Sequence, residues 1–550
     1  MSLRSPALRS VWGGGQLLAL SGMTGPTDYE RGLVGRTSFS GCGIDLVLPY
    51  TASLRFSGSA PMSVFLGGDH FQLILADAPA VRGAFIDAHH LLVEGTCAFV
   101  GAGYDTVING SRTLIAPTGL LDRRHLVIDL DQLIADRQKW TTDLRLPAGC
   151  DEATADAYLK ARVMIRTQTL AAEGAMTGLW TTPDRWPHRD MWLWDSVFHA
   201  IGIAHFDRAM ARRVLDAMFD VQRVDGFIPH QAAATGWRSQ ITQPPVLAFG
   251  MERVMGDTSD LDWIAARFDQ LAAYLRWNEQ NRDTDGNGLV EWYIEANEHC
   301  RSGESGMDNS PRFDDAVQLD AVDFNSFMAA EYRTLARFAR LLGRDDDARR
   351  CDARHRELCA SINGLLWDES TGFYQDRDVV TGRRTGILAN SGFLPLICGA
   401  ASAEQAQRLA RHLEDPATFG TTVPVPSVAV SSRRGGEKDM WRGPMWVNLN
   451  WLIEIGLRDY GLTQAADHVR ERTVAEIVRH HQRHGTFYEF YDSDGATEPG
   501  HLDRKGHRAS PGGNPYHRVI HDFGWTATLF IDMVHRAALD RAQPGQVKRV

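Results

Sequence analysis

The predicted helices of this chain are joined by connections that alternate between short and long, and this alternation restricts the fold more than any other feature. From about residue 151, apolar residues recur with the period of a helix. The predicted helices cover about 151–174, 190–205, 207–222, 244–255, 259–281, 320–342, 345–366, 387–398, 402–413, 443–457, 462–481 and 521–539. After the first, they follow one another almost at once in pairs, and long connections separate the pairs. If paired helices run antiparallel, all the long connections lie at one end. We therefore predict a toroid of helix pairs with one end elaborated for function.

The chain before about Leu146 has a different rhythm. Short apolar runs such as "GIDLVLPY", "FQLILA", "HLLVEGTCAFVGAG", "TLIAP" and "HLVIDL" are separated by Gly, Pro and Asp, as is typical of strands and turns. The "GAG" at 101–103 has no helix after it, so it indicates a turn and not a nucleotide loop. We predict an α+β multidomain protein, with a β-sandwich over residues 1–148 and a helical domain over 149–542.

Composition limits the partners. The 550 residues include 58 basic and 69 acidic side chains, for a net charge of −11, and no block of basic residues. We therefore expect neither nucleic acid nor an anionic membrane as partner, and we predict a neutral ligand. Seven scattered cysteines without a CxxC pair indicate reduced thiols. Because no apolar run approaches the roughly 20 residues of a membrane span, we predict a cytoplasmic protein; its oligomeric state is left open.

The long connections hold an unusual concentration of acids and tryptophans. They are "WTTPDRWPHRDMWLWD" (180–195), "RVDGFIPHQ" (223–231), "SGESGMDNSP" (302–311), "GEKDMWRGPMW" (436–446), "GTFYEFYDSDGATEPG" (485–500) and "HDFGW" (521–525). Aromatic faces can stack on pyranose rings, and Asp, Asn, Arg and His can hydrogen-bond sugar hydroxyls. The alternative is that each Trp only seals a helix junction. We predict that these loops converge on a carbohydrate site.

Five of these segments resemble glycoside hydrolase family 63, and more loosely the trehalases of family 37. The segments are "WLWDSVFHA", "ESGMDNSPRF", "WRGPMWVNLNW", "FYEFYD" and "FGWT", and the resemblance covers about Asp151 to Leu539. It implies a β-sandwich followed by an (α/α)6 barrel, and inverting hydrolysis of α-glycosides, usually α-glucosides. By the same resemblance Asp308 is the general acid and Glu489 the general base.

An inverting glycosidase needs two such carboxyl groups, one protonated on the leaving oxygen and one ionised beside a water on the opposite face. We expect burial among aromatics to raise the pKa of Asp308. The alternatives are an Asx turn at Asp308 and a solvated loop glutamate at Glu489. Glu304 is the nearest rival for the acid role.

Supporting roles follow from the resemblance. Trp194 and Asp195 are expected to hold the reacting sugar, Arg442 to anchor a hydroxyl or a catalytic carboxylate, and Trp441 and Trp525 to wall the pocket. The remaining substrate-binding candidates are Arg189, His230, Gln231, Glu304, Asn309 and His521. A lone histidine beside such a loop is more often a satisfied structural group.

The stretch "DTDGNGLVEW" has the spacing of an EF-hand calcium loop. Its ligand positions are Asp283, Asp285, Asn287, the Leu289 carbonyl and Glu291. The match breaks at the twelfth position, Ile294, where a bidentate glutamate is required. Some family 63 relatives carry calcium in a similar loop. A structural calcium ion and an ordinary Asp/Asn/Gly turn both stay open, and no cofactor is expected to be required for the chemistry.

Other chemistries lack their residues, since the chain has no HExxH, P-loop or GxSxG motif. Two rivals remain: an α-glycoside phosphorylase, and a non-catalytic toroid that only binds carbohydrate. The substrate is a small carbohydrate, with glucosylglycerate, mannosylglycerate, trehalose and short α-glucans all open.

Overall fold

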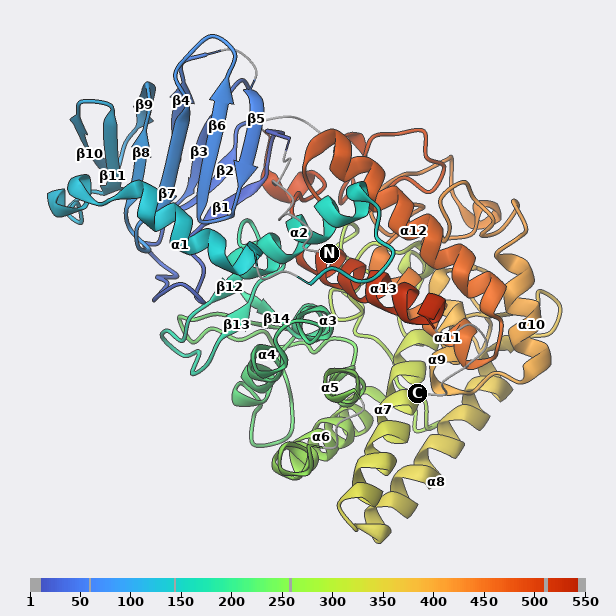
Figure 1. Ribbon diagram of the computed structural model, residues 1–550. Coiled ribbons are helices and arrows are strands. Elements are labelled where there is room, and N and C mark those ends of the chain that lie inside the picture. Colours follow the sequence, from blue (N-terminus) through green and yellow to red (C-terminus); the bar gives the residue numbers. More distant parts are fainter. Residues whose placement is uncertain (1–10, 59–60, 143–144, 257–259, 509–512, 543–550) are drawn as a thin grey trace.

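The computed structural model describes residues 11–58, 61–142, 145–256, 260–508 and 513–542. Its first part is built from strands (Figure 1). They are β1 (Leu17–Ala19), β2 (Val34–Thr37), β3 (Gly43–Leu48), β4 (Ala52–Phe56), β5 (Pro61–Leu66), β6 (His70–Leu75), β7 (Val81–Phe85), β8 (Leu91–Glu94), β9 (Cys97–Gly101), β10 (Tyr104–Asn109) and β11 (Arg112–Pro117).

These strands form two antiparallel sheets that share one apolar core. The sheets have the orders β1-β2-β3-β4-β9 and β10-β11-β8-β7-β6-β5. In β4, Ala52, Leu54 and Phe56 are buried while the residues between them are partly exposed, because successive side chains of a strand point to opposite faces. Leu54 from one sheet and Phe71 from the other belong to the same buried cluster.

The prediction of a strand at "HLVIDL" is wrong. The chain instead forms a 3-10 turn, η1 (Arg123–Val127), and the helix α1 (Leu130–Thr142). Leu126, Leu130 and Ile134 recur every four residues and pack on the face of the six-stranded sheet that points away from its core. The six residues of "HLVIDL" are too few to distinguish this helical spacing from the alternation of a strand. Figure 1 shows α1 crossing the sheet toward the helices.

The second part of the chain is helical, as predicted. Its helices are α2 (Glu152–Thr167), α3 (Leu193–Ile203), α4 (Arg208–Asp220), α5 (Leu247–Met255), α6 (Leu261–Arg282), α7 (Val322–Leu341), α8 (Asp345–Ser361), α9 (Pro395–Cys398), α10 (Ala403–His412), α11 (Val447–Asp459), α12 (Thr463–His484) and α13 (Gly524–Ala542). None of the helices in the described ranges combines the length and apolar character needed to cross a bilayer.

Six of these helices touch one another in a closed series. Contacts join α3 to α5, α5 to α7, α7 to α9, α9 to α11, α11 to α13, and α13 back to α3. A second set packs against the ring: α4 against α3, α6 and α8 against α7, α12 against α11, and α2 against α13. Three of the predicted pairs, α3 with α4, α7 with α8 and α11 with α12, are therefore neighbours in space, whereas α6 packs against α7 and not against its predicted partner α5.

Several predicted helices differ in extent: the helix predicted over 151–174 ends at Thr167, and the one predicted over 345–366 ends at Ser361. The segment 387–398 is a 3-10 turn over Asn390–Phe393 followed by the single helical turn of α9, because Pro395 lacks the N–H that a continuous helix would use. The predicted 190–205 helix starts only at Leu193, since Met191–Trp192 form β14. Short strands of this kind occur throughout the helical part: β12 (Thr169–Leu170), β13 (Trp180–Thr181), β15 (Gln231–Ala232), β16 (Leu319–Asp320), β17 (Trp367–Asp368), β18 (Phe373–Tyr374) and β19 (Arg377–Asp378).

A buried ion pair joins the sheets to the helices. The Lys160 ammonium on α2 lies 2.7 Å from Oδ2 of Asp522, two residues before α13, and both side chains are almost completely buried. The same Asp522 oxygen accepts a hydrogen bond from the backbone N–H of Leu17 in β1, at 2.8 Å. Arg36 in β2 donates to the backbone carbonyl of Asp184, at 2.9 Å. The strands thus fix the loops that lead into α3 and α13.

Replacing Lys160 by Met is expected to lower the free energy of unfolding by about 3–5 kcal/mol, because it leaves Asp522 as a buried carboxylate without its counterion. Urea unfolding followed by circular dichroism measures the loss. Lys139→Met is the matched control, since Lys139 pairs with Asp136 at the exposed surface and such pairs contribute about 0–1 kcal/mol. Equal losses in the two variants would contradict the structural importance of the buried pair.

Candidate active site

All six loops predicted to converge contribute to one cavity of about 460 Å³. Its wall combines aromatic, acidic and basic side chains. The lining residues are Pro183, His188, Trp192, Trp194, Asp195, His230, Gln231, Ile241, Gln243, Glu295, Cys300, Gly303, Gly306, Asp308, Met440, Trp441, Trp446, Glu489, Arg504, Lys505, Tyr516, Phe523 and Trp525. The cavity has the size of a small-molecule site and not of an extended groove.

Five tryptophans, together with Tyr516 and Phe523, form the aromatic part of the wall. Trp441 stacks on Trp446 with ring centroids 3.8 Å apart, and Trp194 meets Trp525 edge to face at 5.2 Å. The indole N–H groups of Trp441 and Trp525 are buried and have no hydrogen-bond partner among the described residues. Buried donors are normally paired, so these two N–H groups are exceptions in the wall.

Glu489 is held by an arginine that the sequence did not single out. Arg504 Nε lies 2.8 Å from Glu489 Oε2, and Nη2 lies 3.0 Å from Oε1. Both side chains are almost completely buried. The backbone N–H of Glu489 also donates to the Ile520 carbonyl at 3.0 Å. A bidentate pair of this kind fixes the orientation of the carboxylate.

Asp308 is paired with Lys505, whose Nζ lies 2.9 Å from Asp308 Oδ2. Burial alone raises the pKa of Asp308, but the ammonium of Lys505, with Arg504 further away, outweighs burial and lowers the pKa below its ordinary value. The expectation of a raised pKa is therefore wrong for this state of the protein. Lys505 has a backbone φ of 54°, a left-handed conformation that is unfavourable for lysine.

Asp195, in the first turn of α3, differs from Asp308 in the direction in which its pKa is shifted. It is 3% exposed, and its Oδ1 has no hydrogen-bond partner within the described ranges. Burial raises the pKa of Asp195 well above its ordinary value, and the nearby charges of Asp184 and Glu489 raise it further. This shift favours the protonated form of Asp195, which can both donate and accept a hydrogen bond.

His230 and Gln231 also line the cavity, as predicted. Burial lowers the pKa of His230 to about 4, so the ring is neutral, and its Nδ1 lies 2.6 Å from Ser239 Oγ. The Gln231 amide donates to Asp190 Oδ2 at 2.6 Å. Both side chains are positioned by neighbours on adjoining loops.

Glu304 does not line the cavity. Its carboxylate is completely buried, lies 2.7 Å from Arg282, and accepts hydrogen bonds from the backbone N–H groups of Thr242 and Tyr293. These bonds use its acceptor capacity and connect the segment after α6 to the Asp308 loop. Neither the expected contact with substrate nor the rival acid role fits this position.

Asn309 and Arg442 also lie outside the cavity lining, and they join two of its loops. Arg442 makes a bidentate pair with Asp314 at 2.8 and 2.9 Å and donates to the Asn309 carbonyl at 3.1 Å. The Asn309 side chain accepts from the backbone N–H of Trp441, at 3.1 Å. The two residues were expected to bind substrate, but they instead position Asp308 and Trp441, which line the cavity.

Arg189 and His521 point toward the strands. The Arg189 guanidinium lies over the ring of Tyr29, 4.3 Å from its centroid. His521 lines a separate, smaller hollow together with Phe39 and Trp186. Burial lowers the pKa of His521 to about 3, so its ring is neutral. The expectation that these two residues bind substrate does not match their positions.

The cations Arg504 and Lys505 were missed because they lie in "HLDRKGHR", outside the segments that resemble family 63. The sequence offered one signal for them, which was their position in the long connection between Glu489, the predicted base, and α13. They also alter the expectation of a neutral ligand, since two cations line the cavity. Tyr516, from the same connection, completes this side of the wall.

The predicted calcium loop brings three carboxylates together. One oxygen each from Asp283, Asp285 and Glu291 lies within 4.8 Å of the others, and Gly288 has the positive φ of 85° that a tight turn requires. Oδ1 of Asp283 is buried and has no hydrogen-bond partner among the residues that the structure describes. Burial, with Asp320 and Asp285 nearby, raises the pKa of Glu291 to about 7.

Asn287, another expected ligand of this loop, makes hydrogen bonds within it. The Asn287 amide nitrogen lies 3.0 Å from Asp285 and 3.1 Å from both oxygens of Asp320, and its oxygen accepts from the Leu289 N–H at 2.8 Å. Leu289, whose carbonyl is the fifth expected ligand, is completely buried.

A ring of helices, a cavity walled by tryptophans and carboxylates held by cations are together characteristic of a glycoside hydrolase. Residues 187–526 match the sequence profile of the mannosylglycerate hydrolase MGH1-like glycoside hydrolase domain. This chain belongs to that family.

Individual relatives agree with the family match. The chain is 28% identical over 446 residues to mannosylglycerate hydrolase of Rubrobacter radiotolerans, covering 65% of this chain and 93% of the relative. It is 24% identical over 413 residues to glucosylglycerate hydrolase of Mycolicibacterium hassiacum, covering 58% and 89%. The structure of the family 63 mannosylglycerate hydrolase from Thermus thermophilus in complex with glucose matches with a TM-score of 0.56 and 26% identity, over 68% of this chain and 99% of that one. The resemblance to family 63 is confirmed.

Proposed function

We propose that this protein is an inverting hydrolase of α-glycosides whose aglycone is a small carboxylic acid such as glycerate. The observation that carries this proposal is the pairing of two cavity carboxylates, each with its own cation: Asp308 with Lys505 and Glu489 with Arg504. The names of the relatives reported above share glycerate and differ in the sugar. Lys505 is the cation placed to meet an aglycone carboxylate, because it contacts the acid that would protonate the leaving oxygen.

The same proposal includes the architecture. We infer a β-sandwich domain over 1–148 and an (α/α)6 barrel over 149–542. The two sheets that share a core support the first assignment, and the closed series of α3, α5, α7, α9, α11 and α13 supports the second. The active site then lies at the barrel end that carries the long connections.

The proposed reaction begins when Lys505 exchanges its partner Asp308 for the carboxylate of the aglycone. When the aglycone carboxylate binds Lys505, Asp308 loses its counterion, its pKa rises, and it takes up a proton. Asp308 then protonates the glycosidic oxygen. Glu489, oriented by Arg504, removes a proton from the water that attacks the anomeric carbon from the opposite face. Asp195 bonds hydroxyls of the sugar, and the tryptophan wall packs against its ring.

A substrate panel tests the proposal. Free sugar should be released from mannosylglycerate or glucosylglycerate at a kcat/KM well above that for trehalose, maltose or an aryl α-glucoside. Adding inorganic phosphate should neither accelerate the reaction nor yield a sugar phosphate, as an α-glycoside phosphorylase would. Binding of these compounds without turnover would indicate a carbohydrate-binding toroid. Preference for trehalose or an α-glucan would refute the glycerate assignment.

We also propose that Asp283, Asp285 and Glu291 hold a structural calcium ion. An all-oxygen set of carboxylates suits this cation, and the buried, unpaired Oδ1 of Asp283 fits a missing positive partner. The cluster is not among the cavity residues, so the ion would contribute to stability and not to the chemical step.

Calcium is expected to raise the melting temperature, by an amount set by RT ln(1 + [L]/Kd), and a chelator is expected to lower it. Scanning calorimetry with calcium or with EGTA measures the shift. Asp285→Asn should abolish it, whereas Asp269→Asn, at an exposed position on α6, should preserve it. If calcium does not change the melting temperature of the wild type, the loop is an ordinary Asp/Asn/Gly turn.

A further inference from the structure

Two histidines and a glutamate meet at the end of α12, away from the cavity lining. His480 and His484 are one turn apart and therefore share a face of the helix. Glu498 reaches them from the connection that follows Glu489. Its Oε2 lies 3.2 Å from His480 Nδ1 and 3.7 Å from His484 Nε2, and one ligand atom from each of the three residues lies within 4.8 Å of the others.

Two of the facing atoms lack hydrogen bonds. His480 is 1% exposed, and its Nδ1 is a buried nitrogen with no hydrogen-bond partner among the described residues. Oε2 of Glu498 is likewise buried and has no hydrogen-bond partner in the part of the chain that the structure describes, while its other carboxylate oxygen pairs with Arg483. Buried polar atoms in folded proteins are almost always satisfied. A shared ligand between them would satisfy both.

The opposite side of each imidazole ring is already occupied. His480 Nε2 lies 2.9 Å from Glu476 Oε1, and His484 Nδ1 lies 2.9 Å from the hydroxyl of Tyr488. Histidines that bind a metal typically use their second nitrogen in this way, because the outer partner fixes the tautomer and the ring orientation. Here the outer partners direct His480 Nδ1 and His484 Nε2 toward Glu498.

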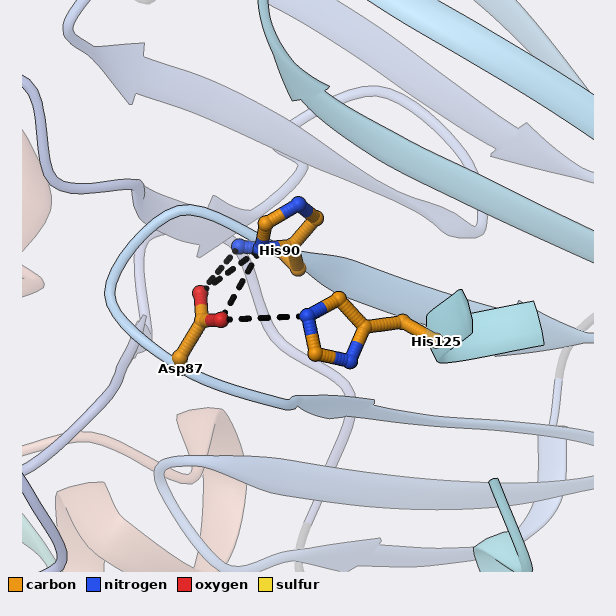
Figure 2. A group of neighbouring side chains, drawn as sticks. All are labelled: Asp87, His90 and His125. Atoms are coloured by element: carbon orange, nitrogen blue, oxygen red, sulfur yellow. Dashed lines mark hydrogen bonds and ion pairs between the residues drawn. The ribbon is translucent and has the colours of Figure 1, made fainter. Parts of the chain in front are cut away.

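A second cluster, formed by Asp87, His90 and His125, differs because the ring nitrogens of its central histidine are already engaged (Figure 2). His90 Nδ1 lies 2.9 and 3.0 Å from the two oxygens of Asp87, and its Nε2 lies 3.0 Å from the Leu120 carbonyl. Both ring nitrogens of His90 are therefore engaged. This cluster connects η1 to the turn after β7 and leaves no buried ligand atom of His90 free.

We propose that His480, His484 and Glu498 bind a divalent transition metal ion of the zinc type. Zinc bonds of about 2.0–2.1 Å place tetrahedral ligand atoms roughly 3.3–3.5 Å apart, close to the observed 3.2 and 3.7 Å. Two imidazoles and one carboxylate suit zinc. The side chains of His484 and Glu498 are 33% and 31% exposed, which gives an ion access and leaves a fourth position for water.

The ion would connect the end of α12 to a later point of the connection that follows it. His484 is the last residue of α12, and Tyr488, its outer partner, directly precedes Glu489. Glu498 lies beyond Glu489 in the same connection. A metal at this point would stabilise the loop that carries Glu489 without touching substrate, so this inference does not depend on the proposed reaction.

Cobalt(II) titration of the chelator-treated full-length protein tests the proposal, because four-coordinate cobalt absorbs strongly in the visible range. The wild type should bind one equivalent with this spectrum and release it to zinc. His484→Gln and Glu498→Gln should each weaken binding by at least about 100-fold. Glu476→Gln, which alters only the outer partner, should weaken it by about 10- to 100-fold.

Two histidine variants serve as controls. His468→Gln changes an exposed histidine on the same helix, and His125→Gln changes the cluster of Figure 2; both should keep the wild-type spectrum. Circular dichroism of each metal-free variant reports whether it is folded. The proposal is overturned if the wild type shows no four-coordinate spectrum, if the spectrum persists in both His484→Gln and Glu498→Gln, or if it disappears in His125→Gln.

Discussion

Asp308→Asn and Glu489→Gln are each expected to lower kcat on the preferred glycoside by roughly 10²–10⁴-fold, the usual contribution of a general acid or base. Both side chains act on the proton transfers of the transition state, so KM should change much less. Steady-state kinetics on mannosylglycerate or glucosylglycerate measures the loss. Glu295→Gln is the matched control, because it is the same carboxyl-to-amide change at the wall of the same cavity; its effect should stay below about tenfold.

The leaving group separates the two roles. A dinitrophenyl α-glycoside departs without a proton, so Asp308→Asn should lose much less activity on it than on a glycerate glycoside. Glu489→Gln should lose about the same on both, because water must be activated in each case. If Asp308→Asn stays fully active while Asp195→Asn does not, the acid role belongs to Asp195.

Lys505→Met is expected to lower kcat/KM for a glycerate glycoside by about 10- to 100-fold, the range of a hydrogen bond to a charged group. A neutral aryl α-glycoside should not share this loss, since it has no carboxylate for Lys505. Lys438→Met, which removes a lysine paired with Asp492 outside the cavity lining, should affect both substrates equally and weakly. An equal loss on the two substrates in Lys505→Met would refute recognition of the aglycone.

The same variant should change the pH profile. In the free protein Lys505 lowers the pKa of Asp308, so the protonated acid becomes scarce as pH rises above that lowered value. Removing the ammonium raises the pKa of Asp308, and the basic limb of kcat/KM should move to higher pH. In the wild type, the basic limb of kcat should lie at higher pH than that of kcat/KM, because bound substrate occupies Lys505.

Periodicity and loop length were sufficient to predict much of the fold. The helix predicted at 320–342 is α7 at Val322–Leu341, and the predicted strand "TLIAP" lies in β11 at Arg112–Pro117. These segments are long or flanked by clear turn signals. "HLVIDL" failed because Leu126, Leu130 and Ile134 show their helical spacing only when the following residues are included.

The site was predicted less completely, for reasons that depend on tertiary contacts. Trp194, Asp195, Asp308, Trp441, Glu489 and Trp525 do line one cavity, because their loops share one end of the helix array. Arg442 and Asn309 lie in the same motifs but form the links between loops, and a motif does not say which of its polar residues faces inward. The pKa of Asp308 depended on Lys505, which is far away in sequence. The spacing of His480 and His484 was visible, but Glu498 reaches them only in the folded chain.

The anomeric form of the sugar first released is the most direct test of the central claim. Proton NMR during rapid hydrolysis of mannosylglycerate or glucosylglycerate should show the β-anomer first and the α-anomer only later, as mutarotation proceeds, because water activated by Glu489 attacks opposite to the leaving group. Initial release of the α-anomer would mean that a carboxylate acts as nucleophile in a retaining reaction, and would contradict the assignment of Asp308 and Glu489 as acid and base.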